Sequence, residues 1–286
     1  MGQGLSAVRA VRAPFADRFR DVGVIAECAS PDILCVQELL SRDAQRFFDA
    51  VVDGHFSSRF RDDNRMRFAG SLTMRGCGLG IGARSPLSKS LVRTFPGAKV
   101  GWDRLARKGA LYTQLSFAGG ITVDLVTAHL QAGYDAGAIA ARMAQLVDLK
   151  MLIDSVGSPE RPFIVCGDFN INGLEDCRGD AQYESLAAAL IGFEDLGATG
   201  DLATFEPVAH GNGLAFALEP EVPTQRIDYI FWRPALGPID LLCTAMARFF
   251  DKPLGQTRLR NGDAGWASDH YGLSAAFALS GRPLEG

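Results

Sequence analysis

Short apolar runs that suit buried strands alternate along the chain with segments whose apolar residues recur at helical spacing. A Gly-Gly pair at positions 119–120 separates two of these runs and predicts a hairpin turn. The alternation of short strands with helices favours a layered α/β domain. We expect strands at residues 32–36, 78–83, 110–117, 121–130, 163–166, 227–232 and 271–279.

Prolines and capping residues mark the expected helix ends. A first helix should begin near Pro14 and end before Pro31, because proline is tolerated in the first turn but not in a helix interior. Ser41 suits the N-cap of a second helix, which would bury Phe47, Phe48 and Val51. A third helix is expected over 135–155, where apolar residues keep helical spacing: Ile139, Met143, Leu146 and Ile153.

Two glycine- and aromatic-rich stretches have a packing interpretation. The glycines at 76, 78, 80 and 82 do not match the dinucleotide-binding spacing, so we expect them to allow close backbone packing in a strand. Residues 249–266 are less regular and predict a long loop or hairpin. Its aromatics Phe249, Phe250 and Trp266 fit core packing better than a membrane-contacting tip, since most aromatics are buried.

The composition is that of a packed globular protein. Hydrophobic residues make up 47% of the 286 positions, which excludes a disordered chain. The length allows two domains, but no repeat or linker divides the sequence. We therefore expect one catalytic domain over 1–286, with an irregular N-terminus at 1–13. The formal charge of −4 gives no basic surface for wrapping nucleic acid, although it does not exclude a nuclease with local contacts.

Targeting signals are not evident in the sequence. No apolar run approaches the ~18 residues of a membrane span, and the first residues lack the apolar segment of a secretory signal. The six cysteines form no CxxC pair and no zinc-type spacing. We expect a protein of the reducing cytoplasm, either free or peripherally associated with membranes.

Polar residues interrupt the apolar runs at the ends of several predicted strands. Burying an ionisable group lowers the stability of the fold by roughly several kcal/mol unless the group is paired, hydrogen-bonded or bound to a metal. A single such residue is as often structural as functional, but together they indicate a site at one sheet edge, where open α/β sheets bind ligands. The residues are Glu38, His129, Asp168, Asn170, Asp228, Asp269 and His270.

The residue types in this group favour a hard metal ion. Carboxylates and an asparagine without a thiolate cluster suit Mg²⁺, or Mn²⁺, better than structural zinc. Phosphoryl transfer uses such an ion, together with a base that activates water and donors for the non-bridging oxygens. His129, Asn170 and His270 can supply the base and the donors.

Five segments resemble, in order, the motifs of the endonuclease/exonuclease/phosphatase superfamily. The resemblance extends over about 18–277 and implies a four-layer α/β sandwich, in which two packed mixed β-sheets are flanked by helices. It also implies Mg²⁺-dependent cleavage of phosphoesters. The segments are Ile-Leu-Cys-Val-Gln-Glu at 33–38, Thr-Ala-His-Leu at 127–130, Gly-Asp-Phe-Asn at 167–170, Arg-Ile-Asp-Tyr-Ile at 226–230 and Ser-Asp-His at 268–270.

The resemblance also implies roles for single residues. Glu38 would hold the metal, and Asp168 and Asn170 would line the attack site. His129 would donate to the phosphate or the leaving oxygen. His270 would be the general base, oriented by Asp228, because the adjacent Asp269 points to the opposite face of an extended strand. Asp269 would then either serve the metal side of the site or support the residues that do. Whether Asp168 or His270 takes the proton from water stays open.

Two further stretches are similar to neutral sphingomyelinases. They are Ala-His-Leu-Gln-Ala-Gly at 128–133 and the segment 103–109, in which Asp103 and Lys108 match a switch near the active site, with the lysine reaching the phosphate. The alternative is an ordinary charged pair on a surface loop. The similarity implies a phospholipid substrate, sphingomyelin, cleaved to ceramide and phosphocholine. A nuclease or another phosphoesterase of the superfamily is the alternative enzyme, which the acidic composition disfavours.

One departure from the family pattern concerns the N-terminus. The family begins with a strand ending in a metal-binding Asn, whereas residues 1–13 contain no Asn and make a poor strand. We therefore expect the first strand to be missing, which would expose the flank of a sheet. The interpretations are a coding start assigned too late, or a truncated, non-catalytic member that acts as a binding module.

Overall fold

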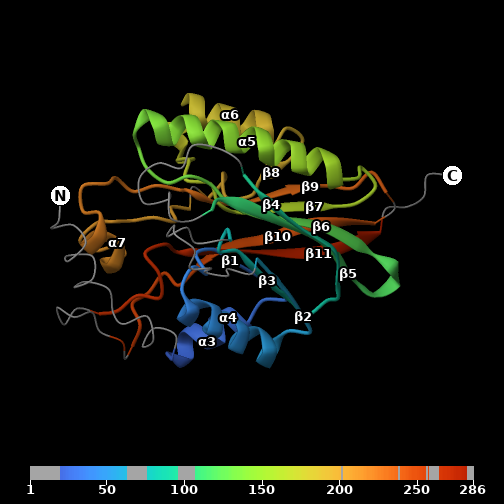
Figure 1. Cartoon of the computed structure of the whole chain (residues 1–286), viewed down its shortest axis with the longest axis horizontal. Coiled ribbons are helices and arrows are strands. Elements are labelled where there is room, and N and C mark those ends of the chain that lie inside the picture. Colours follow the sequence, from blue (N-terminus) through green and yellow to red (C-terminus); the bar gives the residue numbers. More distant parts are fainter. Residues whose placement is uncertain are drawn as a thin grey trace, which may run out of the picture.

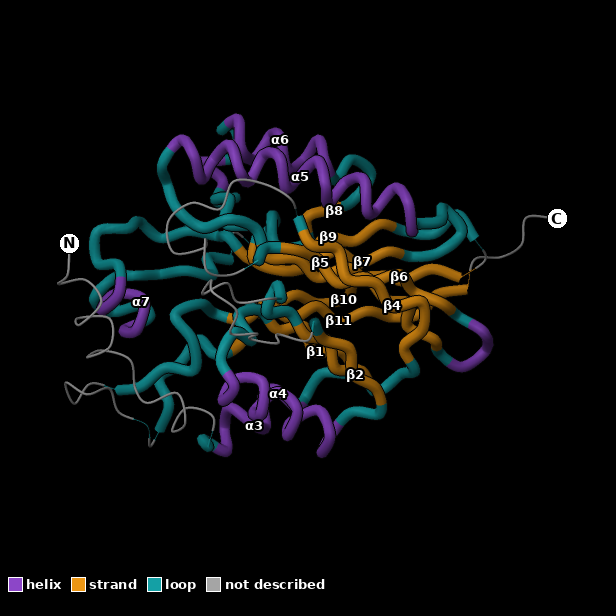
Figure 2. Tube along the Cα trace, viewed as in Figure 1, coloured by secondary structure: helices purple, strands orange, loops and turns teal. Residues whose placement is uncertain are grey.

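The four layers of the expected sandwich are visible in the computed structural model (Figures 1 and 2). It describes residues 20–62, 76–95, 107–200, 202–237, 239–255, 257 and 264–281. Two helices cover a six-stranded sheet, whose other face packs on a second layer of strands, and two further helices cover that layer. The predicted fold class is confirmed. The expectations for the first strand and for a helix start near Pro14 lie outside the described residues.

The six-stranded sheet has mixed strand directions. Its order is β4-β5-β6-β7-β9-β8, with β6 and β7 parallel and the other neighbours antiparallel. The Gly-Gly pair lies in η2 (Ala118–Gly120), which joins β5 to β6 as the predicted hairpin. The strands are β4 (Leu87–Thr94), β5 (Gly109–Ser116), β6 (Thr122–His129), β7 (Phe163–Asp168), β8 (Glu194–Asp195) and β9 (Asp228–Arg233).

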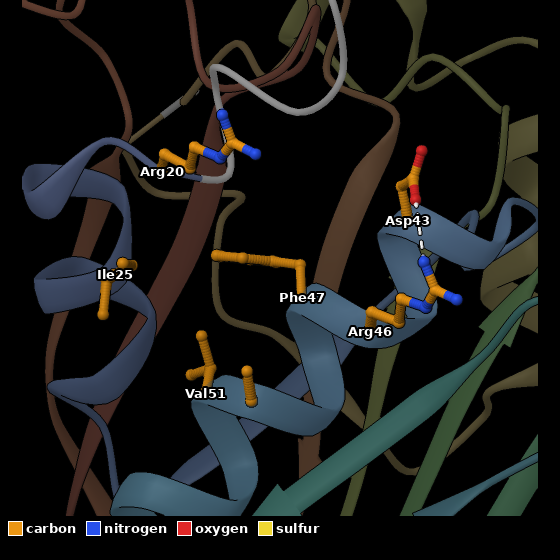
Figure 3. A pocket seen from close by; sticks show the side chains of 7 residues that line it. Arg20, Ile25, Asp43, Arg46, Phe47 and Val51 are labelled. Carbon is orange, nitrogen blue, oxygen red and sulfur yellow. Dashed lines mark ion pairs between the residues drawn. The ribbon is translucent and has the colours of Figure 1, made fainter.

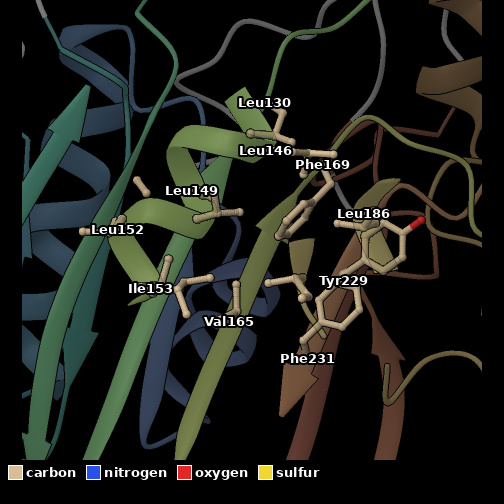
Figure 4. Packing of buried hydrophobic residues seen from close by; sticks show 14 of the residues in the cluster. Leu130, Leu146, Leu149, Leu152, Ile153, Val165, Phe169, Leu186, Tyr229 and Phe231 are labelled. Carbon is tan, nitrogen blue, oxygen red and sulfur yellow. The ribbon is translucent and has the colours of Figure 1, made fainter. Parts of the chain in front are cut away.

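One face of this sheet packs against α5 (Ala136–Val156) and α6 (Ala181–Ala189) (Figure 4). The Asp135 side chain caps α5 by accepting a hydrogen bond from the N–H of Ala138 at 2.9 Å. Alternation along β7 sends Val165 toward the helices and Asp168 toward the second layer. The helix-side core contains Leu130, Leu146, Leu149, Leu152, Ile153, Phe169, Leu186, Tyr229 and Phe231.

The second layer contains two groups of strands. An antiparallel sheet has the order β1-β3-β2, and β10 pairs with β11. β1 comes within 8 Å of β7 and β11 comes within 8 Å of β9, measured between Cα atoms. The polar ends of the strands therefore meet between the layers. The strands are β1 (Ile33–Val36), β2 (Ser58–Arg61), β3 (Gly80–Ala83), β10 (Ile239–Phe249) and β11 (Gly272–Gly281).

The outer helices are α3 (Val22–Ala29) and α4 (Arg42–His55). Ser41 is the predicted N-cap of α4, and its hydroxyl accepts from the N–H of Ala44 at 3.0 Å. A Cβ atom at Gly80 would lie 2.8 Å from the Phe48 ring, and one at Gly82 would lie 2.8 Å from Val52. Gly80 and Gly82 therefore make room for side chains of α4 on β3, whereas the sequence predicted close packing of neighbouring backbone.

The remaining elements were not predicted from the sequence. They are β2, β4, β8, β10, η3 (Glu175–Cys177), α6 and α7 (Gly213–Leu218). Where it is described, the segment 250–266 is irregular, and Trp266 packs with Leu214 and Tyr271 in a small core. Core packing is thus confirmed for Trp266. No helix among the described residues is long and apolar enough to cross a bilayer.

Candidate functional site

Three predicted site residues come from neighbouring strands in direct register. His129 of β6 pairs with Asp168 of β7, and Asp168 pairs with Asp228 of β9. Because paired residues point to the same face of a sheet, the three side chains lie side by side, facing the second layer. Lys108 directly precedes Gly109, which pairs with His129 on the next strand. The sheet register therefore aligns His129, Asp168 and Asp228 in one row, and the Lys108 side chain joins this row through its contact with His129.

Lys108 and His129 form the buried end of this row. The Lys108 Nζ donates to His129 Nε2 at 2.7 Å, and Asp168 Oδ2 lies 3.3 Å from the same nitrogen. An ammonium group can only donate, so Nε2 is the acceptor and the imidazole proton is on Nδ1. Burial, together with the charges of Lys108 and His270, lowers the pKa of His129 well below its ordinary value. His129 is therefore a neutral imidazole here.

His270 and Asp228 form the other end. The His270 Nδ1 donates to Asp228 Oδ2 at 2.8 Å, which is the pairing predicted from strand alternation. The Phe205 ring contacts the imidazole edge-on at 5.3 Å between ring centres. Burial by itself lowers the pKa of His270, but the carboxylates of Asp228, Asp168 and Asp269 outweigh it and raise this pKa well above its ordinary value. The carboxylates thus stabilise the imidazolium form.

Asp168 lies between these two ends. Burial and the neighbouring Asp228 raise the pKa of Asp168 to about 7, although His270 and Lys108 act against this. One ligand atom from each of Asp168, Asp228 and His270 lies within 4.8 Å of the others. The buried Asp168 and the partly buried Asp228 repel each other, and a divalent cation between them would relieve this repulsion. The residues present therefore fit an oxygen-liganded ion.

The backbone between β7 and the next segment is constrained. Gly167 has φ 135°, and a Cβ there would collide with the Ala128 carbonyl oxygen, so the close approach of β6 and β7 requires glycine. Asn170 adopts φ 52°. Its N–H donates to Asp168 Oδ1 at 2.9 Å and its Nδ2 donates to the Leu130 carbonyl at 3.2 Å. The Gly-Asp-Phe-Asn segment thus fixes Asp168 from its own backbone.

Two buried polar residues that the sequence did not single out align His270 with Asp228. The Thr204 hydroxyl accepts from the N–H groups of Ile227 at 3.0 Å and Asp228 at 3.1 Å, and the Thr204 carbonyl accepts from the N–H of Tyr271. Asn212 caps α7 and donates from Nδ2 to the Ser268 carbonyl at 2.9 Å. The Asn-Gly before α7 could have indicated an N-cap, whereas Thr204 carries no sequence signal.

Thr204→Val is expected to destabilise the protein by about 2 kcal/mol, because it leaves two buried N–H groups without an acceptor. Thr204→Ser keeps the hydroxyl and is the matched control, expected to remain closer to wild type. Urea unfolding measures both variants. Equal stability of the Val and Ser variants would contradict a role for the hydroxyl.

The other predicted residues are placed as follows. Glu38 follows β1 by two residues, is exposed and has φ 61°, and it is not part of the ligand-atom group formed by Asp168, Asp228 and His270. Asp269 accepts from the Ser268 hydroxyl at 3.2 Å. Burial raises the pKa of Glu219, and the nearby Asp269 raises it further. Asp103 lies outside the described residues. The roles assigned to all of these residues stay predictions.

A separate depression of about 370 Å³ lies on the outer helical layer (Figure 3). Phe47 of α4 and Ile25 of α3 contribute apolar side chains to it, and Arg46 pairs with Asp43 at 3.8 Å at its rim. Both side chains of this pair are largely exposed. The depression is separated from the His129–Asp168–Asp228–His270 row by the second layer of strands, so we assign it no part in the site.

Comparison with known proteins gives the following similarities. A model of the endonuclease/exonuclease/phosphatase family matches residues 7–270. Beta toxin from Staphylococcus aureus superposes with a TM-score of 0.70, at 17% identity over 92% of both chains. Sphingomyelinase C from Streptomyces griseocarneus has a TM-score of 0.68, at 18% identity over 92% of both chains. D. rerio TDP2 complexed with a single-strand DNA product has a TM-score of 0.66, at 22% identity over 96% of this chain and 95% of that one.

These structural similarities show a shared fold. Another crystal structure of the S. aureus toxin contains bound magnesium ions. No curated protein matches the sequence.

Proposed function

The chain belongs to the endonuclease/exonuclease/phosphatase family, and from this premise we propose that it is a Mg²⁺-dependent phosphodiesterase that cleaves sphingomyelin-type lipids to ceramide and phosphocholine. Members of this family are hydrolases acting on phosphodiester bonds. The observation that carries the proposal is the row of His129, Asp168 and Asp228 in direct register on three strands, completed by His270.

The His270–Asp228 pair would take the proton from the attacking water. Nδ1 of the His270 imidazole donates to Asp228, so the other ring nitrogen, Nε2, is the one that can accept the proton from water. The carboxylates would stabilise the imidazolium formed in this step, but they also raise the pKa of His270. A cation bound beside Asp168 and Asp228 would lower that pKa and so favour the neutral imidazole that can accept the proton. Asp168 and Asn170 would orient the same water, because the Asn170 N–H fixes the Asp168 side chain and the Leu130 carbonyl fixes the Asn170 side chain.

A divalent cation, when bound, would neutralise charge on the phosphate oxygens. Asp168, which is buried, and Asp228, which is partly buried, would hold this ion, since their ligand atoms lie close together. Glu38 and Asp269 are the further ligands that the motif resemblance implies. Mn²⁺ has the same preference for oxygen ligands and would substitute for Mg²⁺.

Lys108 and His129 would bind the phosphate and the leaving oxygen. Lys108 is almost fully buried and brings a positive charge next to His129 in the water-excluded part of the row. Away from water, a positively charged donor that is already held in place stabilises the negative charge that develops on the phosphate oxygens in the transition state.

Lys108→Met is expected to lower kcat by about 10²-fold, because it removes the charge and keeps the length of the side chain. Lys150→Met is the matched control, since Lys150 pairs with Asp154 on the surface of α5. Steady-state kinetics on the same substrate compare the two variants. Unchanged kcat in Lys108→Met would show that the lysine does not contact the phosphate.

The choice of a phospholipid rests on charge and on sequence similarity. A chain with a formal charge of −4 has little general attraction for a polyanion such as DNA or RNA. The stretches at 103–109 and 128–133 are similar to neutral sphingomyelinases. The superposition on sphingomyelinase C supports the same substrate class.

A single-stranded DNA substrate is the second candidate. It is supported by the superposition on TDP2 in complex with a DNA product, which covers 96% of this chain. DNA cleavage would also fall steeply as salt is raised, whereas hydrolysis in neutral detergent micelles would not.

One assay separates the two substrates. Phosphocholine release from sphingomyelin–detergent micelles and cleavage of a labelled single-stranded oligonucleotide are measured with Mg²⁺, using His270→Ala as the blank. We expect phosphocholine release above the blank and no oligonucleotide cleavage. Cleavage of the oligonucleotide without phosphocholine release would replace the lipid proposal with the DNA one.

A further inference from the structure

Two cysteines from the two strand layers meet directly behind the candidate site. Cys35 lies in β1 and Cys166 in β7, and both pack against the core between the layers. The Cys166 thiol and burial raise the pKa of Cys35 well above its ordinary value, and the Thr127 side chain of β6 lowers the pKa of both thiols. Strands β1 and β7 come within 8 Å between Cα atoms, which is close for two stacked layers.

The environment of this pair differs from that of the other interior cysteines. Cys28 and Cys77 are fully buried in separate places, and burial raises the pKa of the Cys28 thiol to about 12. Cys35 and Cys166 keep partial solvent exposure although they lie between the layers. A small oxidant can therefore reach both thiols, which pack against the same core between the layers.

We propose that Cys35 and Cys166 form an oxidation site, at which a peroxide converts the two thiols into a disulfide that links the two strand layers. One thiol sulfur attacks a peroxide oxygen, which gives a sulfenic acid and releases one water from hydrogen peroxide. The second thiol attacks that sulfur, the S–S bond forms and a second water leaves. Two electrons pass from the sulfurs to the peroxide, and dithiothreitol reverses the reaction by thiol–disulfide exchange.

The disulfide would act on the candidate site through the two strands. An S–S bond is about 2.05 Å long, shorter than any non-bonded contact between two sulfur atoms. Cys35 precedes Glu38 by three residues and Cys166 precedes Asp168 by two. Closing the bond would shift the two strand ends relative to each other, and a displacement of about 1 Å at reacting groups lowers rates by up to ~10²-fold. This step rests on the proposed function.

The cross-link is tested in the full chain without using activity. Protein treated with hydrogen peroxide or with dithiothreitol is alkylated, digested and analysed by mass spectrometry. We expect a peptide pair joined through Cys35 and Cys166 after peroxide only, with the other four cysteines alkylated. Alkylation of both residues after peroxide would overturn the proposal. Cys35→Ala and Cys166→Ser should each abolish the cross-link, whereas Cys243→Ser, at another partly exposed cysteine, should retain it.

Activity then tests the effect on the site. Phosphodiesterase activity of the wild type and of Cys243→Ser should fall at least about tenfold with peroxide and recover with dithiothreitol. The activity of Cys35→Ala should not respond to peroxide. A cross-link that forms without loss of activity would overturn the coupling to the site. Reduced protein without activity would instead contradict the proposed function, and the mass measurement would still decide the cross-link.

Discussion

His270→Ala is expected to lower kcat on a phosphodiester by about 10²- to 10⁴-fold, the range typical for loss of a general base. The imidazole is the group in the row whose protonated form is stabilised by three carboxylates, Asp228, Asp168 and Asp269. Its removal leaves water without an acceptor for its proton and leaves Asp228 without its partner at 2.8 Å. Steady-state kinetics at saturating Mg²⁺ measure the effect.

Two controls separate chemistry from folding for this variant. His210→Ala removes an exposed histidine from a turn and should leave kcat unchanged. Because His270 also contacts the Phe205 ring, the thermal unfolding of His270→Ala must be recorded beside the kinetics. A folded variant with kcat within threefold of wild type would exclude His270 as the base.

Arg226→Met is expected to destabilise the protein by about 3–5 kcal/mol, the cost of breaking a buried ion pair. Arg226 is fully buried and forms a fork with Asp195, through bonds of 2.9 and 2.8 Å to its two carboxylate oxygens. Its Nε and Nη2 also donate to the Gly173 carbonyl, and its guanidinium lies over the Tyr229 ring. Methionine fills a similar volume but leaves the Asp195 carboxylate without its charged partner, with only the Tyr183 hydroxyl and the Gly197 N–H as donors.

Urea unfolding of Arg226→Met gives the loss directly. Arg46→Met is the matched control, since Arg46 forms a solvent-exposed pair with Asp43, and such pairs contribute about 0–1 kcal/mol. If Arg226→Met lowers the free energy of unfolding by no more than the control does, the ion pair between Arg226 and Asp195 does not stabilise the fold. Arg226 lies two residues before Asp228, so its ion pair with Asp195 also holds the start of β9 in place.

The sequence predicted the buried elements best, because burial produces a readable pattern. The apolar run at 163–166 marks β7, and Ser41 marks the start of α4. β4 was missed because most of its residues are exposed, so polar side chains conceal the alternation. β10 was missed because its exposed apolar residue Leu242 breaks the alternation of apolar and polar positions that is expected of a strand.

The candidate site was predictable where strands carry it. His129, Asp168 and Asp228 lie at strand ends, so their pattern indicated that they converge, and the register brings them together. The parts supplied by loops were not predictable. Thr204 and Asn212 act only because the segment 202–225 folds back onto β9 and onto the turn before His270, and that path depends on tertiary contacts.

The most direct test of the central claim is Mg²⁺-dependent hydrolysis of a simple chromogenic diester, bis(p-nitrophenyl) phosphate, by the wild type and by His270→Ala. The account predicts p-nitrophenol release by the wild type, its loss with EDTA, its return with added Mg²⁺, and at least a ~10²-fold lower rate in the variant. Release that is absent with Mg²⁺, or equal in the two proteins, would contradict the assignment of this row of residues as a phosphodiesterase site.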